Sequence, residues 1–236
     1  MQYAATISLA RTLLGAGRPD DVARMIEPLA PAVVADPSEA VLHALLARVA
    51  LLSHADPAEA EAHLRPAGSP ISFEIPDVDL WQGWLNAWPY AETFRPVSAR
   101  YHLERAHRLA VRDLDVGQQC WALLGGALLY LLLDEPLLSR HLLQQARRTG
   151  WLRHDREAVC WMYGIEAVLA LRAGDYSAAT DAVEQLRDPA NDMAAELYRF
   201  RALALELRLA VSTGRDERSM ADTVLDRIGD AARTYC

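Results

Sequence analysis

The longest apolar stretch of the chain runs from Cys120 to Leu133, with the sequence CWALLGGALLYLLL, and it contains no charged residue. It is shorter than the ~20 apolar residues that cross a bilayer, and it is too uniformly apolar for a helix with one face in water. We therefore expect a central helix that is covered on nearly all sides. Glu135-Pro136 opens a second helical pattern directly afterwards, and the same arrangement returns from Cys160 onward.

Turn-forming residues recur at nearly constant intervals along the whole chain. The six predicted turns are Gly17-Arg18-Pro19, Ala55-Asp56-Pro57, Phe94-Arg95-Pro96, Asp134-Glu135-Pro136, Gly174-Asp175-Tyr176 and Gly214-Arg215-Asp216, at intervals of 38, 39, 40, 40 and 40 residues. Proline suits the first position of a helix, because no backbone donor is needed there. The spacing predicts about six antiparallel helical hairpins.

Each predicted turn is followed by a small or β-branched residue and, four positions later, by a second residue that is larger in most units. The pairs are Val22 and Ile26, Ala60 and Leu64, Ala99 and Leu103, Ser139 and Leu143, Ala179 and Val183, and Ser219 and Thr223. A spacing of four places both members on one helical face. We expect the first member to let two helices approach and the second to fill the space below. The polar Thr223 is typical of a terminal repeat with one face in water.

Acidic and amide residues stand where the first helix of each later unit is expected to begin. They are Asp36, Asp77 to Asp79, Asp113 to Asp115, Asp155, and Asn191-Asp192. Such side chains accept hydrogen bonds from the free backbone donors of a helix N-terminus. We interpret them as helix caps rather than as catalytic acids.

One linker departs from the pattern. Residues 65–79, with the sequence RPAGSPISFEIPDVD, contain three prolines and a glycine, so a continuous helix is not expected there. The segment either crosses a face of the helical array or forms a hinge between hairpins 1–2 (residues 1–64) and hairpins 3–6 (residues 80–236). We favour the crossing loop, within a single domain over residues 1–236.

Two short motifs resemble those of a known repeat family: Trp121-x2-Leu124-Gly125-x2-Leu128, and Gly174-Asp175-Tyr176 followed by Ala179. The first resembles the Trp-x2-Leu-Gly-x2-Tyr pattern of tetratricopeptide repeats, and the second resembles their hairpin turn. The longer units resemble the helical-repeat sensor regions of bacterial ATPase-type transcription regulators. The resemblance implies an all-α fold, an α-solenoid that winds into a right-handed superhelix, and a concave groove that binds a peptide, a protein or a small effector.

Charge and composition narrow the chemistry of such a module. The chain has 24 basic and 32 acidic residues, a net charge of −8, and all of its basic residues are arginines. Without a basic block it gains little from counterion release, so nucleic acid is not expected as a direct partner. Without lysine, neither a Walker-type phosphate site nor Schiff-base catalysis can operate. The first residues lack the basic region of a secretory signal, so we expect a cytoplasmic protein with no membrane segment.

Cysteine and histidine spacing gives no sign of a metal site or a nucleophile. Cys120, Cys160 and Cys236 form no CxxC pair, and we expect Cys120 and Cys160 to be reduced thiols in the core. The histidines show no HExxH motif. The sequence therefore predicts a non-enzymatic protein without a metal or another cofactor.

The strongest candidate site is a periodic set of tryptophans. Trp81, Trp121 and Trp161 are forty residues apart, Arg201 occupies the next equivalent position, and Trp84 and Trp88 lie on the same helical face as Trp81. One register places these indoles in the groove, and the other places them inside the hairpins, which is the usual location of large aromatics. We favour the interior, and stability measurements on Trp121→Ala would separate the two.

Two further features accompany this set. Gly125, Gly126 and Gly164 lie inside predicted helices, where each costs ~1 kcal/mol, so we expect close packing by a neighbouring helix or ring. Arg201 and Arg208 share a helical face. They form either an anion-binding end of the groove or part of a solvated surface with nearby glutamates.

The leading hypothesis is a protein-protein interaction module, an adaptor, scaffold or regulator sensor piece, that binds a peptide or protein segment in its groove. The predicted site residues are Trp81, Trp84, Trp88, Trp121, Trp161, Arg201 and Arg208. A first alternative is a helical domain that holds a small-molecule or lipid effector in an aromatic pocket. A second is a self-associating structural protein, a homo-oligomer.

Overall fold

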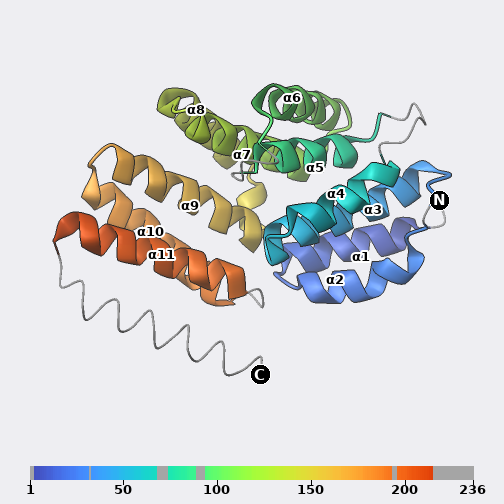
Figure 1. Ribbon diagram of the computed structural model, residues 1–236, viewed down its shortest axis with the longest axis horizontal. Coiled ribbons are helices and arrows are strands. Elements are labelled where there is room, and N and C mark those ends of the chain that lie inside the picture. Colours follow the sequence, from blue (N-terminus) through green and yellow to red (C-terminus); the bar gives the residue numbers. More distant parts are fainter. Residues whose placement is uncertain (1–2, 32, 68–73, 89–93, 193–195, 215–236) are drawn as a thin grey trace.

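The computed structural model describes residues 3–31, 33–67, 74–88, 94–192 and 196–214. All regular secondary structure in these residues is helical (Figure 1), which confirms the all-α fold class. The described α-helices are α1 (Ala4–Gly15), α2 (Pro19–Ile26), α3 (Pro37–Val49), α4 (Pro57–Ala67), α5 (Pro76–Ala87), α6 (Pro96–Arg112), α7 (Val116–Leu132), α8 (Pro136–Arg148), α9 (Arg156–Arg172), α10 (Tyr176–Asp192) and α11 (Glu196–Thr213). Three short helical turns accompany them: η1 (Glu27–Leu29), η2 (Ala50–His54) and η3 (Trp151–Arg153).

The predicted turns separate the two helices of each hairpin. Gly17 and Gly174 adopt positive φ angles of 74° and 72° after α1 and α9, where a left-handed residue ends a helix and glycine carries no steric cost. Proline occupies the first position of α2, α4, α6 and α8. The sixth turn is described only as far as Gly214, and the second helix predicted after it lies outside the described residues.

The paired positions predicted from the sequence are confirmed as core positions after the first five turns. Val22, Ala60, Ala99, Ser139 and Ala179 are fully buried, and their partners four residues later are at most 3% exposed. The hydroxyl of Ser139 donates to the backbone oxygen of Ala127 at 2.7 Å, so this polar side chain is satisfied where α8 packs on α7. Ser219 and Thr223 of the sixth pair lie outside the described residues.

The helices follow one another around an arc (Figure 1). Each α-helix packs on the next one along the chain, and the odd-numbered helices α1, α3, α5, α7, α9 and α11 also pack on one another in that order. The even-numbered helices flank this row. α7 is nearly all buried, as predicted for the central apolar stretch, and none of the described helices is long and apolar enough to cross a membrane.

The arc curves far enough for distant units to touch. α1 contacts α9, and η2 contacts α11, so the first two hairpins lie against the start of the fifth and sixth units (Figure 1). Gly15 at the end of α1 packs against the backbone of His154. One continuous cluster of buried residues extends from Ala44 to Ala202, and side chains of the protein itself fill the centre of the arc.

The predicted helix caps are confirmed in three places and wrong in one. Asp36, Asp115 and Asp155 each accept a backbone hydrogen bond at the start of α3, α7 and α9. Asp77 and Asp79 do not cap α5, which begins after Ile75 without a side-chain cap. Their carboxylates instead bind side chains of neighbouring helices: Asp77 binds Arg11 of α1, and Asp79 binds His102 and Arg105 of α6. Residues 193–195, between Asp192 and α11, lie outside the described residues.

The irregular linker is described at its two ends. α4 continues to Ala67 with Pro66 in its last turn, and α5 begins at Pro76, while residues 68–73 lie outside the described residues. α5 packs on both α3 and α4. Whether the linker acts as a crossing loop or as a hinge stays a prediction.

Candidate functional site

The five predicted tryptophans gather at the centre of the arc. Trp84 is 0% exposed, Trp81, Trp88 and Trp121 are 2% exposed, and Trp161 is 9% exposed. The ring centroids of Trp81 and Trp121 lie 5.5 Å apart, so residues forty apart in sequence are neighbours here. This burial agrees with the interior interpretation of the indoles, and contact between any of them and a partner stays a prediction.

Trp84 separates the second and third members of the periodic set. Its ring lies 5.6 Å from Trp121 and 4.8 Å from Trp161, and its Nε1 donates to the backbone oxygen of Trp121 at 3.1 Å. A Cβ atom at Gly125 would lie 2.8 Å from this Nε1 and 2.7 Å from Leu103. Gly125 is therefore required by close packing, as predicted.

Arg48 brings a buried positive charge into the aromatic centre. It stands in the last turn of α3 and is 5% exposed, and its guanidinium carbon lies 4.5 Å from the Trp121 ring and 5.4 Å from the Trp81 ring. Its Nε and Nη2 donate to Glu157 Oε2 at 3.0 and 2.5 Å. A second carboxylate, Asp155, lies 3.4 Å from Nη2. Arg48 thus joins α3 to the start of α9 across 109 residues of sequence.

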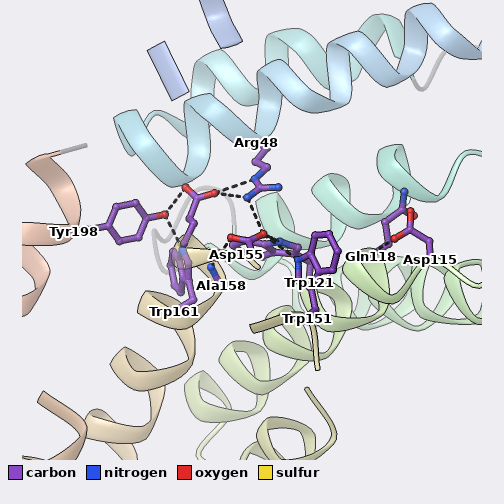
Figure 2. A network of polar contacts seen from close by, with 10 residues as sticks. Arg48, Asp115, Gln118, Trp121, Trp151, Asp155, Ala158, Trp161 and Tyr198 are labelled. Atoms are coloured by element: carbon purple, nitrogen blue, oxygen red, sulfur yellow. Dashed lines mark hydrogen bonds and ion pairs between the residues drawn. The ribbon is translucent and has the colours of Figure 1, made fainter. Parts of the chain in front are cut away.

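Asp155 is the most heavily used acceptor of the centre. One carboxylate oxygen caps α9 through the backbone nitrogen of Ala158 at 3.0 Å. The other oxygen accepts from the indole nitrogens of Trp121 at 2.9 Å and Trp151 at 3.2 Å, and Figure 2 shows both rings converging on it. A single aspartate therefore fixes the start of α9 and orients two tryptophans.

A second branch of the network continues into α11. Trp161 Nε1 donates to the hydroxyl of Tyr198 at 3.2 Å, and this hydroxyl donates to Glu157 Oε1 at 2.6 Å. Figure 2 shows Tyr198 and Trp161 meeting beside the Arg48 branch. Arg48, Glu157 and Tyr198 thereby link α3, α9 and α11 through buried polar groups.

Burial shapes the protonation of these groups. Desolvation by burial raises the pKa of Glu157, and the positive charge of Arg48 opposes this shift. Burial together with the neighbouring carboxylate of Glu157 raises the pKa of Tyr198 well above its usual range, so its phenol keeps the proton it donates. The thiols of Cys120 and Cys160 are buried, and burial raises the pKa of both to about 12. Neither thiol is therefore ionised near neutral pH, and neither is activated as a nucleophile.

An apolar hollow of about 300 Å³ adjoins this network. Its walls come from α7, α9, α10 and α11, and the lining residues are Leu128, Leu131, Cys160, Trp161, Gly164, Ile165, Val168, Leu186, Tyr198, Arg201, Ala204 and Leu205. All of these except Tyr198 and Arg201 are apolar residues or glycine. A Cβ atom added at Gly164 would meet nothing within 4 Å, so the prediction that this glycine is closely packed is wrong: it faces open space.

The two predicted arginines have different environments. The guanidinium carbon of Arg201 lies 4.1 Å from the Trp161 ring and 5.6 Å from the Tyr198 ring, and the residue lines the hollow. Arg208 is exposed and is not among the lining residues. Nearby Glu206 pairs with Arg187 of α10 at 2.9 Å. The structure therefore places Arg201 at the hollow and Arg208 on the surface.

Sequence reasoning missed several members of the network. Arg48 left one usable signal, since it is the only fully charged side chain between Val41 and Leu52 in an otherwise apolar helix, and an isolated charge of this kind is normally paired. Glu157 and Tyr198 left none, because their roles depend on contacts between helices distant in sequence. Among the described residues, no group of three or more acidic, histidine or cysteine side chains is placed to hold a metal ion.

No family model matches the sequence, and no curated protein or solved structure matches the chain. The functional interpretation therefore depends on the geometry of the site itself.

Proposed function

We propose that this protein is a non-enzymatic binding module, an α-solenoid of stacked hairpins that winds into a right-handed superhelix. Its binding site is the apolar hollow between α7, α9 and α11. The ligand is a peptide or protein segment that places one large apolar side chain in the hollow. The described network of Arg48, Asp155 and Glu157 supports a structural role for the aromatic centre, because its donors and acceptors satisfy one another.

The observation that carries this proposal is the hollow itself. Its volume of about 300 Å³ lies at the lower end of the range for small-ligand pockets, which suits one or two side chains of a partner. Its apolar lining favours burial of hydrocarbon, worth ~25 cal/mol per Å².

Gly164 gives the proposal a sharp test, because a side chain there enters open space without displacing a neighbour. Gly164→Leu should fill much of the hollow and leave the fold intact. The matched control is Ala58→Leu, which adds a leucine to an exposed position on α4. Thermal melts of both variants establish that they are folded before binding is compared.

Peptides selected from a random display library with the wild-type protein should carry a large apolar residue. Their Kd, measured by fluorescence anisotropy, should weaken at least about tenfold with Gly164→Leu, or about 1.4 kcal/mol, and should be unchanged with Ala58→Leu. Selected peptides that bind both variants equally well would contradict the hollow as the peptide site.

A second candidate is a small apolar molecule, favoured by a lining that is apolar except for Tyr198 and Arg201. The probe is 1-anilinonaphthalene-8-sulfonate, which combines an apolar ring system with one negative charge. Its fluorescence should rise with the wild-type protein and rise much less with Gly164→Leu. Equal fluorescence with the two proteins would exclude the hollow as the small-molecule site. Self-association and a cytoplasmic location stay predictions.

A further inference from the structure

The charge of the flanking helices is distributed unevenly. α6 contains four arginines and one glutamate, and α8 contains three arginines and no acidic residue, so the two helices together carry a charge of +6 in a chain of −8. The next flanking helix, α10, contains four acidic residues and one arginine. Positive charge is therefore concentrated on two adjacent units and ends abruptly at the third.

Some of this charge has no counterpart among the described residues. Arg100, Arg112 and Arg147 each pair with a nearby carboxylate. Arg108 and Arg148 are exposed, and in the described part of the chain no carboxylate lies within ion-pair distance of them. Arg140 lies on the side of α8 that faces α10, where it lines another hollow together with Asp175 and Asp181.

A groove of about 270 Å³ lies between the two basic helices. Its floor is apolar and is formed by Ala122, Leu123 and Gly126 of α7 together with Leu142 of α8. Its walls include Arg100, Glu104, His107, Arg108 and Gln145. Figure 1 shows α6 and α8 on the same outer side of α7, away from the helices α9 and α11 that enclose the hollow described above.

Exposed apolar side chains extend this groove at the start of both helices. Val97 is 84% and Tyr101 is 55% exposed on α6, and Leu137 is 79% and Leu138 is 46% exposed on α8. Val97, Tyr101 and Arg108 share one helical face, and Leu138 shares the face of Leu142 and Gln145, which line the groove. Each helix thus presents an outer stripe that is apolar at its start and basic towards its end.

We propose that the outer face of α6 and α8 binds an acidic, amphipathic segment of a partner protein. The partner's apolar residues contact the groove floor and Leu138, and its carboxylates pair with Arg108 and Arg148. Guanidinium groups recognise carboxylates through paired hydrogen bonds. α6 has 17 residues, which spans ~25 Å, so the segment is about as long as a helix of four to five turns.

The charge pattern favours a short acidic peptide over a nucleic acid or a membrane. The basic face ends at the acidic helix α10, and the rest of the chain carries the excess negative charge. A long polyanion or an anionic bilayer would extend beyond the two helices and meet that repulsion. A segment limited to the length of α6 avoids it.

The experiment uses the full chain and a fluorescein-labelled synthetic 18-residue helix with leucine on one face and glutamate on the other. The double variant Arg108→Gln, Arg148→Gln should bind it about tenfold more weakly than the wild type, since each exposed ion pair is worth up to ~1 kcal/mol. A peptide with glutamine in place of glutamate should bind weakly to both. Fluorescence anisotropy reports each Kd.

The control is a second double variant with the same net charge, Arg24→Gln, Arg65→Gln, whose exposed arginines lie in the first two hairpins. It should bind the acidic peptide as the wild type does. Equal weakening in both double variants would show unspecific attraction and overturn the proposal. Tighter binding of a thymidine oligonucleotide, or of phosphatidylserine-containing vesicles, than of the peptide would also overturn it. Gly164→Leu should leave this binding unchanged, which separates it from the hollow.

Discussion

Trp121 shows how a single side chain serves both apolar packing and a polar network. Its ring is buried against Trp81 and Trp84, a guanidinium lies over its face, and its Nε1 donates to Asp155. Removing the indole leaves a cavity and takes one hydrogen bond from the buried carboxylate of Asp155. Both losses contribute to the free energy of unfolding.

We expect Trp121→Ala to lower the free energy of unfolding by ~3 to 5 kcal/mol, as is typical of a buried aromatic residue. Trp121→Phe keeps most of the packing and loses the hydrogen bond to Asp155. Its cost in unfolding free energy should therefore be smaller, at ~1 to 3 kcal/mol. Urea denaturation of the two variants checks both values. A loss well under ~1 kcal/mol for Trp121→Ala would mean that the indole is not a core residue.

Two glycines of neighbouring helices should respond in opposite ways to alanine. A Cβ at Gly125 would lie 2.7 Å from the Leu103 side chain, whereas a Cβ at Gly164 would meet nothing within 4 Å. Gly164→Ala should therefore stabilise the protein by ~0.5 to 1 kcal/mol, and Gly125→Ala should destabilise it. Differential scanning calorimetry gives the sign of each change. The same sign for both substitutions would contradict this packing.

These glycines also show what the sequence can reveal at the scale of residues. A glycine inside a helix lowers stability, so from the sequence we expected close packing by a neighbour at both positions. The sequence could not distinguish a close neighbour from an open hollow, because the distinction depends on the side chains of other helices. Asp77 gives the same lesson: its position suggested a cap, but the Arg11 guanidinium binds it at 2.8 and 2.9 Å.

At the scale of elements, the contact between α3 and α9 depends on buried charge. Arg48 faces two carboxylates, Asp155 and Glu157, which are 2% exposed. Breaking a buried ion pair from one side typically costs ~3 to 5 kcal/mol, because the remaining charge is left without compensation. Without Arg48 the two carboxylates lose their counter-charge, so the free energy of unfolding should depend more strongly on pH.

We expect Arg48→Met to cost ~3 to 5 kcal/mol near pH 7 and less at pH 5. Burial raises the pKa of Glu157 and Arg48 opposes the shift, so removing Arg48 raises the folded-state pKa further above that of the unfolded chain. A carboxyl group with a raised pKa binds its proton more tightly when folded. The deficit should then shrink as pH falls, by at most ~1.4 kcal/mol per pH unit for one proton.

Urea denaturation of wild type and Arg48→Met across this pH range gives the difference directly and cancels the groups that titrate equally in both. The double variant Arg48→Met, Glu157→Gln should recover part of the loss near pH 7, because the uncompensated carboxylate is gone. A deficit that stays constant or grows as pH falls would mean that buried charge is not its origin.

At the scale of the whole molecule, periodicity predicted which helices are neighbours along the array. Turn spacing, the paired positions such as Ala99 and Leu103, and the adjacency of Trp81 and Trp121 all agree with the structure. Periodicity carries no information on contacts between units far apart, such as α1 with α9 and η2 with α11. Those contacts depend on curvature accumulated over several hairpins, which no local pattern specifies.

This closure of the arc changes how the array should unfold. In an open array each unit contacts only its neighbours, so local regions can unfold separately. Here the buried ion pairs of Arg48 with Asp155 and Glu157 join the first two hairpins to the last two, together with the contacts of α1 and η2. One buried cluster also spans the centre. We expect amide hydrogen exchange in the core of α3 and of α9 to report nearly the same opening free energy in the wild type.

With Arg48→Met that coupling should be weakened. The amides of α3 and α4 should exchange faster than those of α7 and α8, because the N-terminal hairpins lose their buried ion pairs with α9 and keep only their packing on α5 and the small contacts of α1 and η2. Mass spectrometry of peptides from each region measures the difference, and Arg24→Gln on the exposed surface of α2 serves as the control. Equally faster amide exchange in all helices would indicate a uniform loss of stability. The arc would then unfold as one cooperative unit even without the Arg48 ion pairs.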